Sequence, residues 1–340
     1  MSDGLWDVLA SVQEIAAITE RSNVPDILSL GECMVEFFAE EPLAEAEQVQ
    51  KAFAGDALNL LAAASRLGSS CGFLSRVGND PFQKYLLNGW ESLGIDTSHV
   101  KRVEGRNGIY FISIYGHGER DFTYYRAGSA PSTMTPEDLD PDYIAQARVL
   151  HISGITLAIS ESARATALAA ARMANEAYVC VSFDPNFRPA LWPAAEARAA
   201  AEELLPHVDI ALPSGPEESE QLFGLKTPQE TADYLRGFGA YAVAVKLGGA
   251  GVYLSTEDGT QTVTALTVPH VVDTTGAGDA FNGAFLHGLV ENMPPLEAAR
   301  LGVVMAGLKV QGRGAIASLP EKSEVEAALA AWEQKSDMLP

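Results

Sequence analysis

Short apolar segments alternate with helical stretches along most of this chain, and that alternation constrains the fold more than any other feature. Repeated strand-then-helix units place parallel strands side by side and cover both faces of the resulting sheet with helices. The sequence therefore predicts an α/β fold, a three-layer sandwich around a mostly parallel central sheet. Strands are predicted over 27–32, 71–76, 149–153, 179–183, 210–212 and 242–246, and helices over 55–68, 81–93, 163–174 and 194–205.

The segment 101–129 interrupts this alternation. Its aromatic and β-branched runs at 109–115 and 121–125 flank a Gly-His-Gly-Glu turn, which predicts a β-hairpin. With strands near 35–54, the hairpin would form a small antiparallel β sheet outside the main one, serving as a lid over a cleft. The domain organisation predicted is a helical extension over 1–25, in which apolar residues recur at helical spacing, and one domain over 26–330.

The charge balance limits the partners of this chain. It carries 45 acidic and 23 basic residues, a net charge of −22, and no basic stripe, which excludes nucleic acid and anionic membrane surfaces. Bound nucleotide phosphates would need locally placed Arg or Lys and a divalent cation. Three widely separated cysteines, Cys33, Cys71 and Cys180, indicate buried free thiols in a reducing compartment. With no 18-residue apolar run and no apparent signal peptide, the protein is expected to be cytoplasmic.

A glycine-rich turn, Asp273-Thr274-Thr275-Gly276-Ala277-Gly278-Asp279, leads directly into an apolar helix that continues through Phe285. Small side chains let the backbone N–H groups of Gly276, Ala277 and Gly278 converge, and the helix adds the positive end of its dipole. The turn therefore predicts an anion site, most readily for phosphate. Asp279 would be ionised in the first helical turn, where it could accept a proton from a hydroxyl during phosphoryl transfer.

Four polar or glycine-rich features follow predicted strands or open helices at one edge of the sheet. Ligands in open α/β sheets bind at the carboxyl ends of the strands. The convergence of the four features at this edge therefore predicts one binding site there. The four are Gly55-Asp56-Ala57-Leu58-Asn59, Asp184-Pro185-Asn186-Phe187-Arg188, Lys246-Leu247-Gly248-Gly249 and the turn 273–279.

Two arginines and two tyrosines are candidates for substrate contacts. Arg126 follows the second arm of the hairpin, and Arg188 lies between two prolines. A guanidinium can bind a carboxylate through two parallel hydrogen bonds. Tyr110 and Tyr124, one on each arm, could contact a sugar face and its hydroxyls. Surface arginines paired with nearby acids, and tyrosines packing across a hairpin, explain the same residues without a ligand. The six histidines show no metal-binding spacing, and no Walker or protein-kinase motif occurs.

Together these segments resemble the ribokinase-like (pfkB-type) carbohydrate kinase family. The run 273–285 resembles the family's C-terminal signature, and 55–59 with 76–82 its N-terminal one. Within the family, the likeness is greatest to kinases of 2-keto-3-deoxygluconate. It is carried by Gly31–Glu36, 108–111, 119–126, 153–157, 184–188 and Leu191-Trp192, and extends over roughly 26–320.

The resemblance implies a ribokinase-like fold and ATP-dependent phosphorylation of a sugar acid, 2-keto-3-deoxy-D-gluconate, to its 6-phosphate. It implies ATP and Mg²⁺, allows a monovalent cation such as K⁺, and implies a homo-oligomer, a dimer or higher. Asp279 would be the base and Gly276, Ala277 and Gly278 the anion hole. The sugar would contact Gly55, Asn59, Tyr110, Tyr124, Arg126 and Arg188; the nucleotide would contact Lys246, Gly248 and Gly249; and cations would lie near Glu217 and Asp273.

Three departures from the family pattern stand out. Ala54 replaces the first of two glycines, Ser214 replaces an asparagine in the Asn-x-x-Glu element that helps position magnesium, and residues 1–24 have no counterpart.

Fructokinase or another pfkB-type sugar kinase is the alternative function, because fructokinases share the Asp-Pro-Asn-x-Arg and Leu-Trp elements. A sugar sensor on an inactive kinase fold is a further alternative, which the presence of Asp279 and the two turn glycines disfavours. A nucleoside substrate is disfavoured by the lid tyrosines and arginines.

Overall fold

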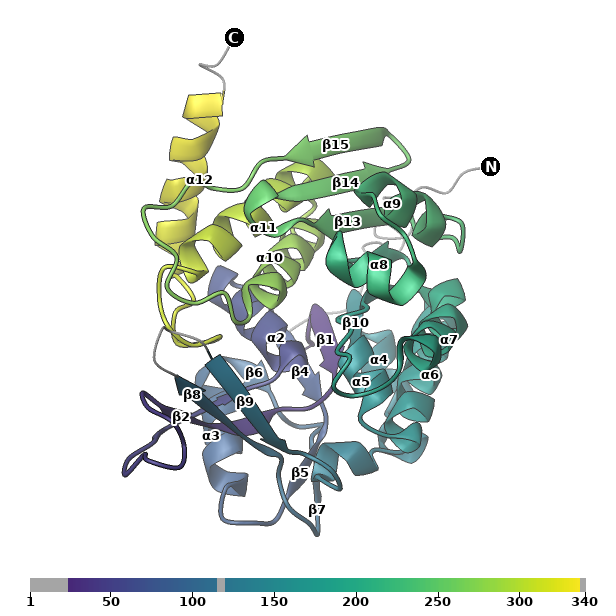
Figure 1. Ribbon diagram of the computed structural model, residues 1–340. Helices are drawn as coiled ribbons and strands as arrows, with labels where there is room; N and C mark the ends of the chain where they lie inside the picture. Colours follow the sequence, from purple (N-terminus) through teal and green to yellow (C-terminus); the bar gives the residue numbers. More distant parts are fainter. Residues whose placement is uncertain (1–23, 115–119, 337–340) are drawn as a thin grey trace.

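The computed structural model describes residues 24–114 and 120–336 (Figure 1). The expected N-terminal helix and the turn of the expected hairpin lie outside the described residues. Within the described ranges, no helix is both long and apolar enough to cross a membrane.

Sheet A, the central sheet, has the order β15-β14-β13-β12-β11-β10-β1-β4-β6. Every pairing from β13 to β6 is parallel, and β14 and β15 extend one edge as antiparallel strands. The predicted mostly parallel sheet is therefore confirmed. Its strands are β1 (Ile27–Leu30), β4 (Cys71–Leu74), β6 (Ile95–Asp96), β10 (Val149–Ser153), β11 (Cys180–Asp184), β12 (Ile210–Ala211), β13 (Ala242–Lys246), β14 (Val252–Thr256) and β15 (Gly259–Val263).

Two hydrophobic cores lie on opposite faces of sheet A, because successive side chains of a strand point to opposite sides. On β1, Ile27 packs in one core and Leu28 in the other, and both are fully buried. The result is the three-layer sandwich that the alternation predicted. The first core takes α2 (Asp56–Leu67), α3 (Gln83–Ser92), α10 (Ala277–Val290), α11 (Pro295–Lys309) and α12 (Lys322–Ser336); the second takes α4 (Pro141–Ala145), α5 (Gly154–Ala158), α6 (Glu161–Glu176), α7 (Ala194–Leu204), α8 (Glu217–Phe223) and α9 (Pro228–Arg236).

Sheet B, the smaller sheet, has the order β3-β2-β8-β9 and lies beside the main body in Figure 1. Its outer pairings are antiparallel, whereas β2 and β8 run parallel at its centre. The arms β8 and β9 pair antiparallel with Tyr110 opposite Tyr124, which confirms the pairing of the two predicted arms. The strands are β2 (Met34–Ala39), β3 (Gln50–Ala54), β8 (Ile109–Ile114) and β9 (Arg120–Tyr125).

The predicted strand 71–76 is divided in the structure. β4 ends at Leu74, and Arg76 begins β5 (Arg76–Gly78), which pairs with β7 (Lys101–Val103) in a separate two-stranded sheet. The first residues of the segment 101–129 therefore belong to this pair, and the part of this segment that joins sheet B begins at Ile109.

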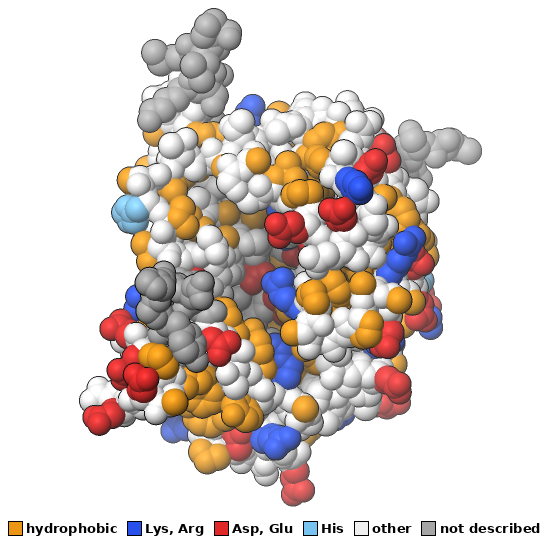
Figure 2. Space-filling view, in the orientation of Figure 1, with side chains coloured by type: hydrophobic (Ala, Val, Ile, Leu, Met, Phe, Trp, Pro, Cys, Tyr) orange, Lys and Arg blue, Asp and Glu red, His pale blue; other side chains and the backbone are white. Residues whose placement is uncertain are grey.

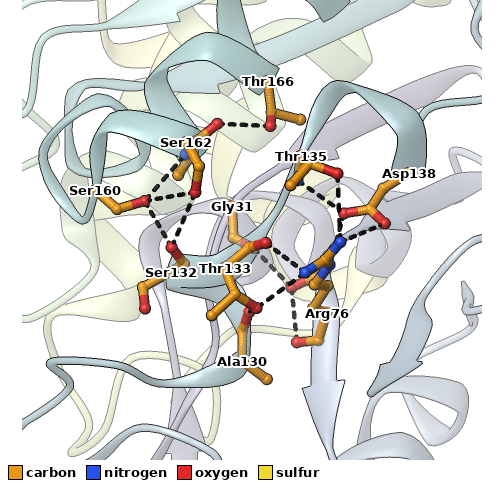
Figure 3. A network of polar contacts seen from close by, with 12 residues as sticks. Gly31, Arg76, Ala130, Ser132, Thr133, Thr135, Asp138, Ser160, Ser162 and Thr166 are labelled. Atoms are coloured by element: carbon orange, nitrogen blue, oxygen red, sulfur yellow. Dashed lines mark hydrogen bonds and ion pairs between the residues drawn. The ribbon is translucent and has the colours of Figure 1, made fainter. Parts of the chain in front are cut away.

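Polar contacts connect β5 to the segment that follows sheet B (Figure 3). Arg76 donates to both carboxylate oxygens of Asp138, at 2.6 and 2.9 Å, and to the carbonyl of Thr133. The next part of the network joins this segment to the residue that caps α6, since Ser160 Oγ donates to the carbonyl of Ser132 at 2.6 Å. These bonds fix the chain where it returns from sheet B to the body. The three cysteines are free and buried, as predicted.

Candidate active site

The close crossing of α10 and α2 places the predicted base. A Cβ added to Gly283 would lie 2.3 Å from the carbonyl oxygen of Leu60, so a larger residue would push the helices apart. At the start of this crossing, Asn59 Nδ2 donates to Asp279 Oδ2 at 2.8 Å. Two predicted site residues that are 220 positions apart in the sequence therefore meet directly.

The glycine-rich turn has the backbone geometry that an anion site needs. Gly276 has φ 75°, and a Cβ there would lie 2.8 Å from Ala315 Cβ, so only glycine fits without movement. The N–H of Ala277 donates to the carbonyl of Thr274 at 3.1 Å, which closes the turn. Gly276 and Gly278 are left as the donors of the turn, since no backbone acceptor for their N–H groups occurs among the residues described.

The pKa of Asp279 is raised to about 7, first by burial and then by the nearby carboxylate of Asp56. The hydrogen bond from Asn59 and the charge of Lys246 act in the opposite direction. A carboxylate with this pKa changes protonation state near neutral pH, as a general base requires.

A buried polar triad lies beside Asp279. Lys246 Nζ bonds Asp184 Oδ2 and, at 3.2 Å, Asn282 Oδ1, while Asn282 Nδ2 donates to Asp184 Oδ2 at 2.6 Å. Sequence reasoning assigned Lys246 to the nucleotide and gave Asp184 and Asn282 no role. Their spacing held the signal, since Asn282 follows Asp279 by three positions on α10 and so shares its helix face.

Asp56 lies between the two ends of the site, since its charge raises the pKa of both Glu32 and Asp279. Its carboxylate accepts from Ser153 Oγ and from Asn186 Nδ2, the latter at 2.9 Å. No specific role was predicted for Asp56, although it precedes Asn59 by three positions on α2. It adds to the negative charge that the site must balance.

The two carboxylates at the start of α8 differ in position. Glu217, the residue predicted to lie near magnesium, is exposed. Glu218 instead accepts from the N–H groups of Phe187 and Ser214, the latter at 2.7 Å, and its pKa is raised by burial and by Asp184. Glu218 is therefore the carboxylate that faces the buried triad, and the predicted residue Glu217 is not.

Asp273, the other predicted cation neighbour, is buried and holds the turn in place. Its two carboxylate oxygens accept from the N–H groups of Thr275 and Gly314, each at 2.8 Å. Within the described ranges, no group of three or more His, Cys, Asp or Glu side chains is arranged to hold a metal ion.

A cavity of about 460 Å³ opens behind the turn, a size suited to a small-molecule ligand. It brings together the predicted nucleotide residues Lys246, Gly248 and Gly249 with Ala277 and Gly278 of the turn. Its remaining wall is mostly apolar and comes from Ser214, Gly215, Gly251, Ala265, Leu266, Val268, Val271, Thr274, Phe281, Val303, Ala306, Gly307 and Val310.

At the other end of the site, Glu32 and Arg126 form a buried ion pair with an N–O distance of 3.0 Å. Glu32 is 1 % exposed, and burial raises its pKa to about 7 while Arg126 lowers it. In the part of the chain that the structure describes, Glu32 Oε2 and Arg126 Nε lack a hydrogen-bond partner, and Glu32 Oε1 and Arg126 Nη1 meet as an ion pair without hydrogen-bond geometry. Buried polar atoms left in this state are suited to a polar ligand.

The two tyrosines come from neighbouring strands of sheet B. Tyr110 and Tyr124 stack with ring centroids 5.6 Å apart, and the Arg126 guanidinium lies 4.6 Å from the Tyr124 ring centroid. Tyr110 is buried and donates to Glu36, whereas Tyr124 is 46 % exposed. Tyr124 is thus the ring that a ligand can reach. Its pKa is raised by burial, and Arg126 and Arg188 both lie near enough to oppose that rise.

Gly55 and Arg188 complete the set of predicted sugar contacts. A Cβ on Gly55 would lie 2.1 Å from the carbonyl oxygen of Glu32, so glycine allows the loop between β1 and β2 to pass close to the start of α2. Arg188 is exposed and donates to the carbonyl of Phe187 at 3.5 Å. Figure 2 shows a hollow at the centre of this face, where acidic and basic side chains gather.

A mostly parallel α/β sandwich with an anion turn, a partly buried carboxylate beside it and a second small sheet is the architecture of a small-molecule kinase. Residues 24–322 match the family described as pfkB family carbohydrate kinase, and the chain belongs to this family.

Named relatives cover nearly the whole chain. A 2-dehydro-3-deoxygluconokinase of Bacillus subtilis (strain 168) is 34% identical over 90% of this chain and 96% of its own length. Fructokinase-2 of Solanum lycopersicum is 33% identical over 91% and 97%. The crystal structure of a PfkB protein from Polaromonas sp. JS666 superposes with a TM-score of 0.82 at 34% identity, covering 90% of this chain and all of that one. The protein is thus a carbohydrate kinase with a ribokinase-like α/β fold.

Proposed function

We propose that this kinase transfers the γ-phosphate of ATP to the 6-hydroxyl of 2-keto-3-deoxy-D-gluconate. The contact between Asn59 and Asp279 beside the anion turn carries the proposal for the reaction. The arginines near Tyr124 carry the proposal for a substrate that bears a carboxylate.

In the proposed reaction, Asp279 accepts the proton of the sugar hydroxyl as that oxygen bonds to the γ-phosphorus. The bond between this phosphorus and the bridging oxygen breaks, and ADP leaves. The N–H groups of Gly276 and Gly278, at the positive end of α10, would stabilise charge on the transferring phosphoryl group. Asn59 holds the Asp279 carboxylate in one orientation, so the base does not have to be repositioned during the reaction.

Magnesium fits this site as an ion bound mainly through the phosphates. It usually keeps several waters and takes one or two protein carboxylates, so the lack of a carboxylate cluster in the described ranges agrees with that mode. We assign the nearest protein carboxylate to Glu218 in place of Glu217. The ion would supply positive charge between the phosphates and the acidic residues.

For the sugar, we assign different roles to the two arginines. Arg126 already faces the carboxylate of Glu32, so this pair offers both donors and acceptors to sugar hydroxyls. Arg188 is exposed and pairs with no acidic side chain among the ion pairs of the described residues, so it would bind the carboxylate of the sugar acid. Tyr124 and Gly55 would contact the remainder of the sugar, and sheet B would cover it as a lid.

Fructose is the second candidate substrate, because fructokinases are similar to this chain at nearly the same identity as the sugar-acid kinases. Fructose has no carboxylate, so the role of Arg188 separates the two. An assay of ADP release should compare 2-keto-3-deoxygluconate, its galactonate-derived epimer, fructose and ribose. The proposal expects the highest kcat/KM with a keto-deoxy acid; a higher value with fructose would refute it.

Replacing Arg188 sharpens the assignment. Arg188→Ala should raise KM for the sugar acid by about 10–100-fold, since a guanidinium–carboxylate pair is worth a few kcal/mol when shielded from water. KM for ATP should stay within about twofold. A larger effect on ATP would instead place Arg188 at the nucleotide.

A homo-oligomer formed through sheet B and a cytoplasmic location remain predictions.

A further inference from the structure

Lys309, in the last turn of α11, is a charged residue with no solvent exposure. Its Nζ donates to the backbone carbonyl of Asp273 at 2.9 Å. Burying an ammonium group is costly unless polar groups surround it, and this contact holds the Lys309 Nζ at a defined place. That place is the first residue of the segment that carries the anion turn.

The residues that follow Lys309 hold the same segment. The carbonyl of Val310 accepts from the N–H groups of Val272 and Asp273, at 2.8 and 3.1 Å, and the N–H of Gly314 donates to Asp273 Oδ2 at 2.8 Å. Ala315 lies against Gly276, where no larger residue fits. The segment 309–315 therefore fixes both the start of the turn and the glycine that shapes it.

The resemblance to pfkB kinases allows a monovalent cation such as potassium near Asp273. Backbone carbonyl oxygens are the ligands that such an ion uses. Here the Asp273 carbonyl already accepts from the Lys309 ammonium, and the Asp273 carboxylate oxygens accept from backbone N–H groups. The donor set around Asp273 therefore does not fit a potassium ion.

We infer that Lys309 is a positioning residue that supplies the cation of this site as part of the chain. Its ammonium holds the Asp273 carbonyl, and through it the turn whose N–H groups bind the phosphoryl group. The protein should then need no monovalent cation. The effect on catalysis rests on the proposed function, whereas the absence of potassium binding does not.

The first test uses the unmodified protein. Thermal unfolding should give the same midpoint, within about 1 °C, in potassium chloride and in choline chloride at equal ionic strength, because a bound ion would stabilise the native state. ADP release with a sugar acid should likewise differ by less than about twofold between the two salts. Potassium-dependent stabilisation or activation would overturn the inference.

The second test removes the ammonium. Lys309→Ala should lower kcat about tenfold or more while KM for the sugar changes less than about twofold, since the turn acts on the transferring group. Potassium chloride, but not choline chloride, should then raise the unfolding midpoint and restore part of kcat. Lys322→Ala, an exposed lysine paired at 4.0 Å with Glu326, is the matched control and should change neither.

The outcomes separate the two proposals. If Lys309→Ala loses kcat but neither its midpoint nor its kcat responds to potassium, Lys309 only caps α11 and the inference fails. If the midpoints behave as expected but no sugar is phosphorylated, the proposed function fails and the inference about potassium stands. If Lys309→Ala does not fold, the salt comparison on the unmodified protein still decides the question.

Discussion

Arg76 and Arg126 are buried to a similar extent, with side chains 17% and 14% exposed, yet their surroundings differ. Arg76 donates to both Asp138 oxygens and to Thr133, so its guanidinium is well bonded (Figure 3). Arg126 contacts Glu32 through Nη1 as an ion pair without hydrogen-bond geometry, and its Nε lacks a hydrogen-bond partner among the described residues.

The difference separates a structural arginine from a binding one. A buried guanidinium whose donors are all used has nothing left for a ligand and contributes to stability. Buried donors and acceptors left without partners cost stability, and a polar substrate can satisfy them. We therefore expect changes around Arg76 to affect folding, and changes in the site to affect turnover and substrate binding.

The largest expected effect is on turnover at Asp279. Asp279→Asn should lower kcat by about 10³-fold or more, because an amide cannot accept the sugar proton. The same change should leave stability unaltered or raise it by about 1–2 kcal/mol, because it removes a partly buried charge whose pKa burial has raised. Steady-state kinetics and urea unfolding measure the two effects. A variant that retains turnover would remove Asp279 from its proposed role.

Arg76→Met tests the opposite half of the comparison. It leaves Asp138 without its guanidinium and should cost about 2–3 kcal/mol in the free energy of unfolding. For the folded fraction, kcat and KM should stay within about twofold of the unmodified protein. The exposed i,i+4 pair Arg198–Glu202 provides the control, since Arg198→Met should cost less than about 0.5 kcal/mol. A strong loss of activity without loss of stability would contradict the structural role of Arg76.

The same contrast shows how far the sequence could be read. The alternation of strands and helices, the hairpin arms and the turn 273–279 depend on local patterns, and the first two were predicted correctly. The Arg76 network could not be predicted, because it joins β5 to a segment some 60 residues away through side-chain geometry alone. The unequal positions of Glu217 and Glu218 also escaped, since neighbouring carboxylates are equivalent until the entry angle of α8 is known.

Breaking the Glu32–Arg126 pair should weaken sugar binding. The expected factor is smaller than the factor by which the loss of Asp279 lowers turnover. Arg126→Met should raise KM for the sugar by about 10–100-fold and destabilise the protein, because it leaves Glu32 buried without its cation. Adding Glu32→Gln should recover part of the stability but not the sugar affinity. The double-mutant cycle should give a coupling free energy of about 1–3 kcal/mol. Coupling near zero would show that the pair is not an energetic unit.

The smallest expected effect is the pH dependence. Asp279 acts as a base only when ionised, and its pKa is raised to about 7, so kcat/KM should fall about fourfold between pH 8 and pH 6.5.

Stability should change with pH in the opposite direction. Folding raises the pKa values of Asp279 and Glu32 from 3.8 and 4.5 to about 7, so between these limits the folded state binds more protons than the unfolded state. The free energy of unfolding should therefore fall as pH rises from about 4 to about 7. Glu32→Gln should make that fall shallower and leave the loss of turnover at low pH in place, because that loss belongs to Asp279. If Glu32→Gln abolished the low-pH loss of kcat/KM, the titrating group would lie at the sugar end of the site and Asp279 would not be the group that limits turnover.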